Sequence, residues 1–270
     1  MDDLLTSTEV ARLAGVGPTA VKRWADAGVL KCVKTAGGHR RFERKEVDRF
    51  LRGAGALSGE DWQDWTDAAL SESSVPALLS RLFHLRAELG SWHRAADRVG
   101  AFVDDLGRRW ESGALTVVQE HIISHALQRA LATIVETIPV PPSAPRVFLA
   151  AAEGDTHTLG LSLAELCARE AGWRSEWGGP HTRTTDVIER VTSGDVAMIA
   201  LSASAQSGQA EALGGEVREV AAACREHNVE LALGGAGKWP DDPSVGRRFH
   251  SFEPFYRFAL ETRGKVEGEG

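Results

Sequence analysis

The feature of this sequence that most limits its fold is a proline-rich segment near its middle. Four of the seven residues from Pro139 to Pro145 are prolines, and proline both removes a backbone donor and ends helices. The residues before this segment have an almost wholly helical pattern, whereas those after it alternate between apolar runs and amphipathic stretches. The segment therefore predicts a boundary between two kinds of domain.

The C-terminal part, residues 146–265, has the pattern of an α/β domain. Strands are expected at 146–151, 196–201 and 229–233, and helices at 159–171, 185–192 and 214–227. Strands alternating with helices of this length predict a doubly wound parallel sheet. Ligands of such sheets bind beyond the carboxyl ends of the strands, so the chemistry is expected in the three loops that follow them. The charged, Gly-rich tail 261–270 is expected to be disordered.

The preceding region, residues 56–140, predicts a four-helix bundle. Apolar residues recur at helical spacing in two stretches, residues 78–85 and residues 122–134. Residues 52–60, rich in Gly, Ala and Ser, read as a linker that leads into this bundle. The fold class is thus multidomain, with all-α and α/β parts.

The first 55 residues have the outline of a winged helix-turn-helix domain. Thr6 and Glu9 have the spacing of a helix capping box, and Gly17 and Pro18 form a turn that leads into a second helix. Residues 31–42 read as a two-stranded wing, and a third helix follows over residues 44–51.

Charge is distributed unevenly along the chain. The first 55 residues carry eleven Lys and Arg against seven Asp and Glu, a net charge of +4, while the whole chain has a net charge of −7. The remainder therefore carries −11. A polyanion such as DNA is expected to bind the N-terminal fifth of the chain.

Other classes of protein are disfavoured by what the sequence contains. The three cysteines, Cys32, Cys167 and Cys224, lie far apart and suggest neither disulfides nor a zinc site. The sequence has no stretch of eighteen apolar residues and starts without a secretory signal, so no membrane association and a cytoplasmic location are expected. No nucleophile, acid–base pair or redox pair suggests an enzyme.

The three loops at the expected strand ends carry a recognisable set of residues. They contain Asp155-Thr156-His157-Thr158-Leu159-Gly160, then Ser202-Ala203-Ser204, then Gly234-Gly235. In this order they resemble the cobalamin-binding domain family, with its D-x-H-x-x-G, serine and Gly-Gly loops. Taken alone, the first motif is equally well explained as a helix N-cap with a chance histidine.

The resemblance implies that His157 ligates cobalt from below and that Asp155 accepts a hydrogen bond from the other imidazole nitrogen. A carboxylate of this kind fixes the tautomer of a metal-bound histidine and raises its basicity. Gly160 would allow close approach, while the two serines, Ser202 and Ser204, and the glycine pair Gly234 and Gly235 would leave a slot for the nucleotide tail of the cofactor.

The bundle contributes a second motif. Trp110 is followed after nine residues by Glu120-His121, which resembles the upper-face motif of the CarH-type photoreceptors, light-responsive repressors that use adenosylcobalamin. The resemblance implies that Trp110 stacks over the upper ligand and that Glu120 and His121 hold its polar groups. Alternatively, Trp110 is a core residue and Glu120 a solvated one. Glu111 stands where that family has a histidine that ligates cobalt after illumination.

The N-terminal domain resembles the MerR family, on the run Gly37-Gly38-His39-Arg40-Arg41-Phe42. The resemblance implies that the second helix enters the major groove and that the wing grips the DNA backbone. By position, we expect contacts to base edges and nearby phosphates from Thr19, Lys22 and Arg23. We expect contacts to phosphates from His39, Arg40 and Arg41.

Together these features predict a cobalamin-dependent, light-responsive repressor that binds operator DNA as a homo-oligomer, a dimer or a tetramer. In this hypothesis adenosylcobalamin docks between the bundle and the α/β domain, and changes at its upper ligand alter oligomerisation. Three alternatives stay open at this point. These are a MerR-type regulator of another ligand or tetrapyrrole, a cofactor-independent regulator, and a corrinoid-carrying methyltransferase subunit.

Overall fold

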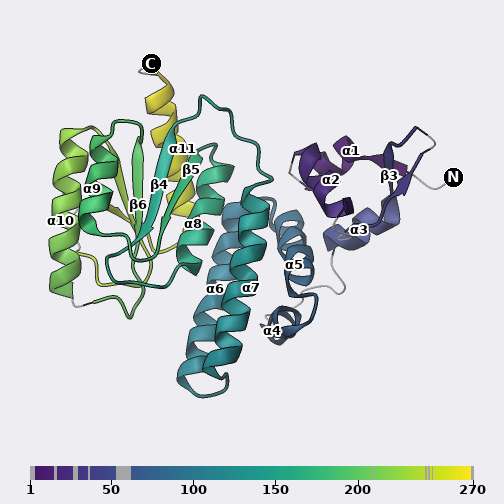
Figure 1. Ribbon diagram of the computed structural model, residues 1–270, viewed down its shortest axis with the longest axis horizontal. Helices are drawn as coiled ribbons and strands as arrows, with labels where there is room; N and C mark the ends of the chain where they lie inside the picture. Colours follow the sequence, from purple (N-terminus) through teal and green to yellow (C-terminus); the bar gives the residue numbers. More distant parts are fainter. Residues whose placement is uncertain are drawn as a thin grey trace. The chain divides into compact units, whose positions relative to one another are not determined.

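The computed structural model describes residues 4–14, 17–26, 30–35, 37–52, 62–208, 210–240, 242, 244 and 246–268. Contacts within the chain divide it into two compact units, Met1–Pro139 and Val140–Gly270. The division falls inside the proline-rich segment, and Figure 1 shows the helices and strands of both units. None of the described helices is long and apolar enough to cross a membrane.

The first unit begins with a small winged domain, which we call the head. Its helices are α1 (Ser7–Ala14), α2 (Pro18–Asp26) and α3 (Arg44–Arg52), and its strands are β1 (Leu4–Thr6), β2 (Val33–Lys34) and β3 (Arg40–Glu43). The strands form an antiparallel sheet in the order β1-β3-β2. The predicted capping box is present, since Thr6 N–H donates to Glu9 Oε2 at 2.7 Å and Glu9 N–H donates to Thr6 Oγ1 at 3.2 Å.

Strand β1 was not predicted by the sequence pattern. Its three residues are too few to show a period of two, and its pairing with β3 places Leu5 opposite the buried Phe42. The expected wing is confirmed as strands β2 and β3, with Gly38 at a positive φ of 76° in the turn between them.

Four helices complete the first unit and confirm the predicted bundle. They are α4 (Trp62–Leu70), α5 (Ser74–Leu89), α6 (Trp92–Glu111) and α7 (Val117–Val135). Each buries an apolar face, and fully buried side chains include Trp65, Leu82, Phe102, Ile123 and Leu131. Of the expected linker 52–60, Arg52 ends α3 and residues 53–60 lie outside the described part of the chain.

The second unit is a doubly wound parallel sheet, as predicted. Its strands are β4 (Arg146–Ala151), β5 (Arg174–Gly179), β6 (Met198–Ser202), β7 (Glu230–Gly234) and β8 (Arg247–Arg248), in the order β5-β4-β6-β7-β8. All neighbouring pairs are parallel. The connection reverses direction between β4 and β6, so the loops after these two strands meet at the switch point where such folds bind ligands.

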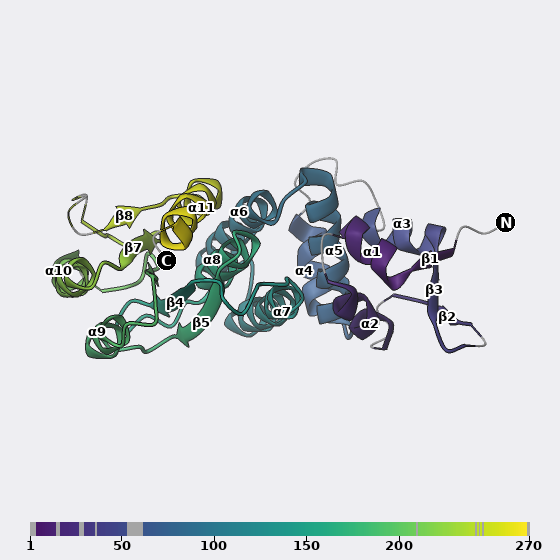
Figure 2. The same ribbon diagram turned by 90° about the horizontal axis from the view of Figure 1, so that it is seen from above.

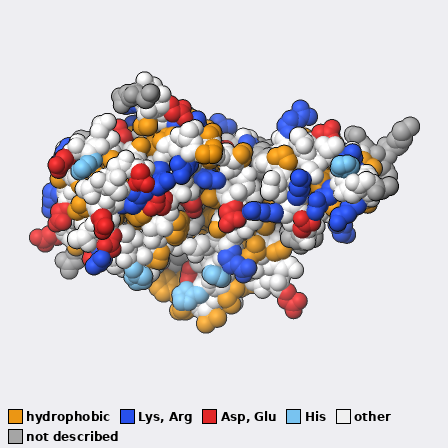
Figure 3. Space-filling view, turned by 45° about the horizontal axis from the view of Figure 1, so that its top comes forward, with side chains coloured by type: hydrophobic (Ala, Val, Ile, Leu, Met, Phe, Trp, Pro, Cys, Tyr) orange, Lys and Arg blue, Asp and Glu red, His pale blue; other side chains and the backbone are white. Residues whose placement is uncertain are grey.

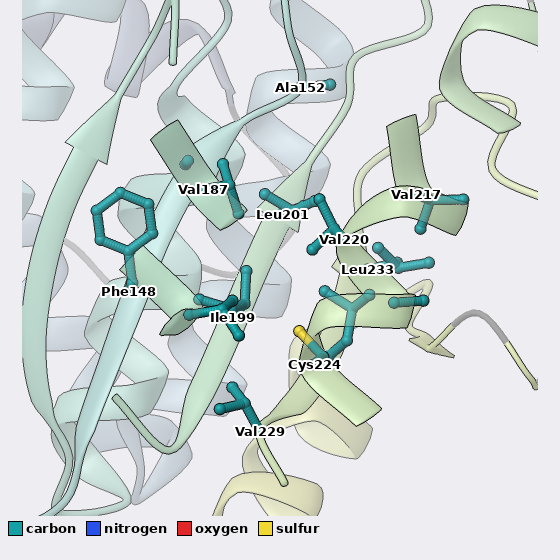
Figure 4. Close-up of a cluster of buried hydrophobic side chains, with 14 of the residues drawn as sticks. Phe148, Ala152, Val187, Ile199, Leu201, Val217, Val220, Cys224, Val229 and Leu233 are labelled. Carbon is teal, nitrogen blue, oxygen red and sulfur yellow. The ribbon is translucent and has the colours of Figure 1, made fainter. Parts of the chain in front are cut away.

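Two helical layers cover this sheet (Figure 2). Helices α9 (Thr184–Thr192) and α10 (Ala210–Glu226) lie on one face, and α8 (Leu159–Glu170) and α11 (Phe252–Gly268) lie on the other. On the α9–α10 side the core is a continuous apolar cluster (Figure 4), in which the strand residues Ile199 and Leu201 meet Val187, Val217 and Val220. The sheet edge bearing the loops is thereby held on a rigid support.

One sequence-based expectation about this unit is wrong. The tail from residue 261 was expected to be disordered, but α11 continues to Gly268. The helix is anchored upstream by buried Phe255 and Phe258, and Thr262 is buried as well. Within its last turns, Arg263 Nε donates to Glu267 Oε1 at 2.8 Å. Charged residues that had suggested disorder thus form an i,i+4 pair that stabilises the helix.

Candidate cofactor-binding site

Asp155 lies at the centre of the three loops that end the strands. Its Oδ1 accepts hydrogen bonds from the backbone N–H and from ring Nδ1 of His157, both at 2.8 Å. Its Oδ2 accepts from the backbone N–H of Ser204 at 2.6 Å and from the hydroxyl of Ser207. With a side chain only 1% exposed, Asp155 joins the first loop to the second.

These contacts keep Asp155 ionised. Burial, the largest single influence, would raise the pKa of its carboxyl group. The hydrogen bonds from Ser207, Ser204 and His157 stabilise the charged form more strongly, and together they lower the pKa of Asp155 to about 2. At neutral pH a carboxylate therefore faces Nδ1 of His157, so that this nitrogen carries the proton and the lone pair lies on Nε2.

His157 is suited to a metal that brings most of its own ligands. Its side chain is 53% exposed although Nδ1 is held by Asp155. In the described part of the chain, no group of three or more His, Cys, Asp and Glu residues could hold a bare metal ion. A single exposed Nε2 with a carboxylate behind Nδ1 fits the cobalt of a corrin, whose ring supplies the equatorial nitrogens.

Backbone hydrogen bonds fix the three loops to one another. Ala152 N–H donates to the Ser202 carbonyl at 2.8 Å, and Ala203 N–H donates to the Gly234 carbonyl at 3.2 Å. Gly237 N–H donates to the Ala203 carbonyl at 2.8 Å. The cobalt-binding loop expected from the sequence is therefore part of one continuous network along the sheet edge.

The glycines of the third loop permit this close approach. Gly235 has a φ of +83°, and a Cβ atom there would lie 2.2 Å from the carbonyl oxygen of Ala203. A Cβ on Gly237 would lie 2.4 Å from Cβ of Ala203, whereas one on Gly160 would lie 3.5 Å from Oγ of Ser202. The loops thus pack directly on each other, so this packing requires the glycines at 235 and 237. The slot for a nucleotide tail stays a prediction.

Two residues of this network were missed by sequence reasoning. Ser207 donates to Asp155 from a position three residues beyond Ser204, and Gly237 packs on the second loop from two residues beyond Gly235. Their types were visible in the sequence, but only the turn over 204–207 and the bend after β7 bring them to the site. The sequence motifs had ended at Ser204 and Gly235.

The residues expected at the upper face lie on the first unit. Trp110 is the last but one residue of α6 and is 38% exposed, so it is not a buried core residue. On α7, Glu120 Oε1 accepts from Ser124 Oγ at 2.5 Å, and Glu120 Oε2 lies 3.6 Å from Nε2 of His121. The His121 side chain is 73% exposed. Glu111 is exposed beside Trp110.

The residues expected to meet DNA lie on the head. Thr19, Lys22 and Arg23 are exposed on α2, as expected for a helix that enters a groove. His39 is exposed on the wing. Arg40 is half-buried and pairs with Asp26 at 2.5 Å, which ties the wing to α2.

Arg41, the last of the expected contacts, is also half-buried, and it donates to the Arg40 carbonyl at 3.1 Å. The two wing arginines therefore differ from the α2 residues in having contacts inside the head. Contact of any of these six residues with DNA stays a prediction.

Two protein-family models match parts of the first unit. A helix-turn-helix domain model matches residues 4–55, and a B12 binding domain model matches residues 97–134. The chain joins a helix-turn-helix domain to a B12-binding domain. The B12-matched residues cover most of α6 and of α7, so they contain Trp110, Glu120 and His121.

Two known proteins share larger parts of this architecture. The HTH-type transcriptional repressor CarH of Myxococcus xanthus is 26% identical over 200 residues, which is 61% of this chain and 67% of the repressor. The monomethylamine corrinoid protein of Methanosarcina barkeri has a similar structure, with a TM-score of 0.54 and 16% identity, covering 74% of this chain and 95% of that protein. At that identity the likeness shows a shared fold.

Proposed function

We propose that this protein is a cobalamin-dependent transcriptional repressor that binds operator DNA as an oligomer and responds to light. The observation that carries the proposal is the pairing of an ionised, buried Asp155 with the exposed ring of His157, in a chain that also has a helix-turn-helix head. The likeness to the CarH repressor supports the same combination of functions.

In this proposal His157 Nε2 would bind the cobalt of the cofactor. Asp155 holds the ring by Nδ1, and Ser204 and Ser207 hold Asp155, so the imidazole is oriented before the cofactor arrives. The loops bearing Gly160, Ser202 and the third-loop glycines would receive the nucleotide tail. Bound adenosylcobalamin would supply a cobalt–carbon bond that light can break.

Trp110, Glu120 and His121 are proposed to contact the upper side of the same cofactor. Their support is the exposure of Trp110 and His121 and the family match over residues 97–134. Because Glu111 is a carboxylate, it is a poor ligand for oxidised cobalt. We therefore propose that position 111 would supply no ligand to cobalt.

The regulatory output is proposed to be a change of assembly. One helix-turn-helix domain buries too little surface for tight specific binding, so several heads are needed on one operator. A cofactor that favours one assembly state by several kcal/mol would be sufficient to switch DNA binding. A dimer or tetramer and a cytoplasmic location are part of this proposal.

An absorption experiment tests the proposal. The purified protein would be mixed with adenosylcobalamin in darkness, desalted and scanned before and after green light. We expect a retained cobalamin spectrum in darkness and a changed spectrum after light, together with loss of a gel shift on the DNA upstream of its own gene. A colourless desalted protein would exclude cobalamin binding, and an unchanged gel shift would exclude light control.

A corrinoid-carrying methyltransferase subunit is the second candidate, favoured by the fold shared with the monomethylamine corrinoid protein. The two candidates predict different behaviour towards DNA. A carrier subunit would retain cobalamin without binding DNA, whereas a regulator would bind the upstream DNA through the head. Binding that is lost when Lys22 is replaced by Ala would favour the regulator.

A further inference from the structure

An aromatic cluster joins the head to the bundle within the first unit. Phe83 of α5 packs edge-on against Trp24 of α2 with ring centroids 4.4 Å apart, and its ring lies 5.6 Å from that of Phe50 on α3. All three residues are buried. A side chain of the bundle therefore forms part of the core of the head, and α2 is held beside the bundle (Figure 1).

A backbone contact holds the start of α2 at the end of α7. The N–H of Gly17, immediately before α2, donates to the carbonyl of Thr137 at 3.3 Å. Thr137 follows α7, which ends at Val135. The positive end of the α2 dipole thus meets the negative end of α7, an arrangement that stabilises both ends.

An ion pair is formed at the same place. Arg23 Nη1 lies 3.2 Å from Oε2 of Glu136, the C-cap residue of α7. A carboxylate is unfavourable at a helix C-terminus, and the last turn of α7 has no basic residue of its own. Arg23 of α2 supplies the positive charge that compensates Glu136.

We propose that Glu136 competes with DNA phosphate for Arg23, so that the end of a bundle helix sets the DNA affinity of the head. The next residue, Trp24, is buried against Phe83, so the backbone of Arg23 stays beside Glu136. Only the long side chain of Arg23 is then free to change partners, and it is 61% exposed. A movement of α7 would alter this competition directly.

The inference rests on the proposed DNA binding of the head and is independent of cobalamin. Several Lys and Arg side chains lie on the face of the head seen in Figure 3, so an approaching phosphate backbone would meet positive charge there. Glu136 opposes that attraction by occupying Arg23.

The test is a double-mutant cycle on DNA binding by the full chain. The variants are Glu136→Gln, Arg23→Gln and both together, measured by fluorescence anisotropy on a labelled duplex of mixed sequence at several salt concentrations. We expect Glu136→Gln to tighten binding about two- to fivefold at low salt, as for an exposed ion pair. The slope of log K against log salt should steepen by up to about 0.9, the value of one added phosphate contact.

In the Arg23→Gln background, Glu136→Gln should change neither affinity nor slope. Glu72→Gln, which makes the same change of charge at an exposed residue between α4 and α5, is the matched control. An equal effect of Glu136→Gln with and without Arg23, or no effect at all, would overturn the inference while leaving the DNA-binding proposal intact. Absence of binding by the unaltered chain would instead overturn the proposed DNA binding.

Discussion

The carboxylate of Asp155 holds both the backbone N–H and the ring Nδ1 of His157, each at 2.8 Å. Two contacts from one oxygen fix the position and the tautomer of the imidazole together. The other oxygen of Asp155 accepts from Ser204 and Ser207 in the second loop. The orientation of His157 therefore depends on these two serines as well.

Replacing Asp155 by Asn tests this dependence. The amide cannot ionise, and in either orientation its NH2 group replaces an oxygen that accepts from a backbone N–H, that of His157 or that of Ser204, so the ring is held less firmly. We expect cobalamin affinity to fall about 10- to 100-fold, as for other partners of metal-bound histidines. An absorbance titration with hydroxocobalamin measures it, with the exposed Asp242→Asn as control. Equal affinities in both variants would contradict the prediction.

Ser207→Ala tests the support of Asp155. The folded-state pKa of about 2 lies below the ordinary value near 3.8, so Asp155 stabilises the fold above about pH 4, and this stability is lost as the pH falls toward 2. Without the Ser207 hydroxyl the pKa of Asp155 rises. We expect a loss of about 1–2 kcal/mol at neutral pH and a smaller further loss in acid, measured by urea unfolding. Parallel pH profiles for both proteins would refute this.

The sequence predicted the parts of this site that lie next to a strand end. Asp155, His157 and Gly160 follow β4 directly, and the parallel topology alone brings the loop after β6 alongside them. Ser207 could not be placed in the same way, because its contact depends on the turn that starts at Ser204. Loop geometry is decided by hydrogen bonds that leave no periodic signal in a sequence.

The missed elements of the fold have related causes. Strand β5 (Arg174–Gly179) alternates poorly between apolar and polar residues, since it is an edge strand with half-buried side chains, and β8 has only two residues. Both lack the continuous apolar run of the central strands β4 and β6. Helix α11 was missed because its charged end concealed the buried face around Phe255 and Phe258.

Gly235→Ala tests the packing of the third loop on the second. The residue has a φ of +83° and its Cβ would lie 2.2 Å from a backbone oxygen of Ala203. Gly194→Ala is the matched control, because it has a φ of +78° with nothing within 4 Å of its Cβ. We expect the control to lose about 1–2 kcal/mol of unfolding free energy and Gly235→Ala to lose clearly more. Equal losses in thermal or urea unfolding would show that the loops do not pack as described.

Trp110→Ala tests the proposed upper-face contact. Trp110 and Trp177 are equally exposed, at 38% and 37%, so removal of either ring should affect folding stability similarly. Loss of Trp110 should speed the dissociation of adenosylcobalamin about tenfold or more, through loss of a stacking contact. The rate is followed by the cobalamin absorbance retained after desalting in darkness. An unchanged rate for Trp110→Ala, or an equal change for Trp177→Ala, would argue against the contact.

Glu216 makes the second unit sensitive to pH close to neutrality. Its Oε1 accepts the backbone N–H of Glu153 at 3.2 Å, and the Glu153 side chain in turn accepts from Thr184 at the start of α9. Burial is the largest influence on the pKa of Glu216 and, with the charge of Glu153, raises it to about 7 despite the hydrogen bond.

The folded chain therefore keeps a proton on Glu216 that the unfolded chain releases above about pH 4.5, so stability from this group falls as the pH rises from about 4.5 through 7. Glu216→Gln retains an oxygen acceptor for Glu153 but cannot ionise. We expect the variant and the unaltered protein to be equally stable near pH 4.5 and the variant to be more stable near pH 8, by on the order of 1–3 kcal/mol. Urea unfolding at both pH values measures this, with the exposed Glu219→Gln of the same helix as control. A gain that is the same at both pH values would mean that Glu216 is already ionised in the folded state.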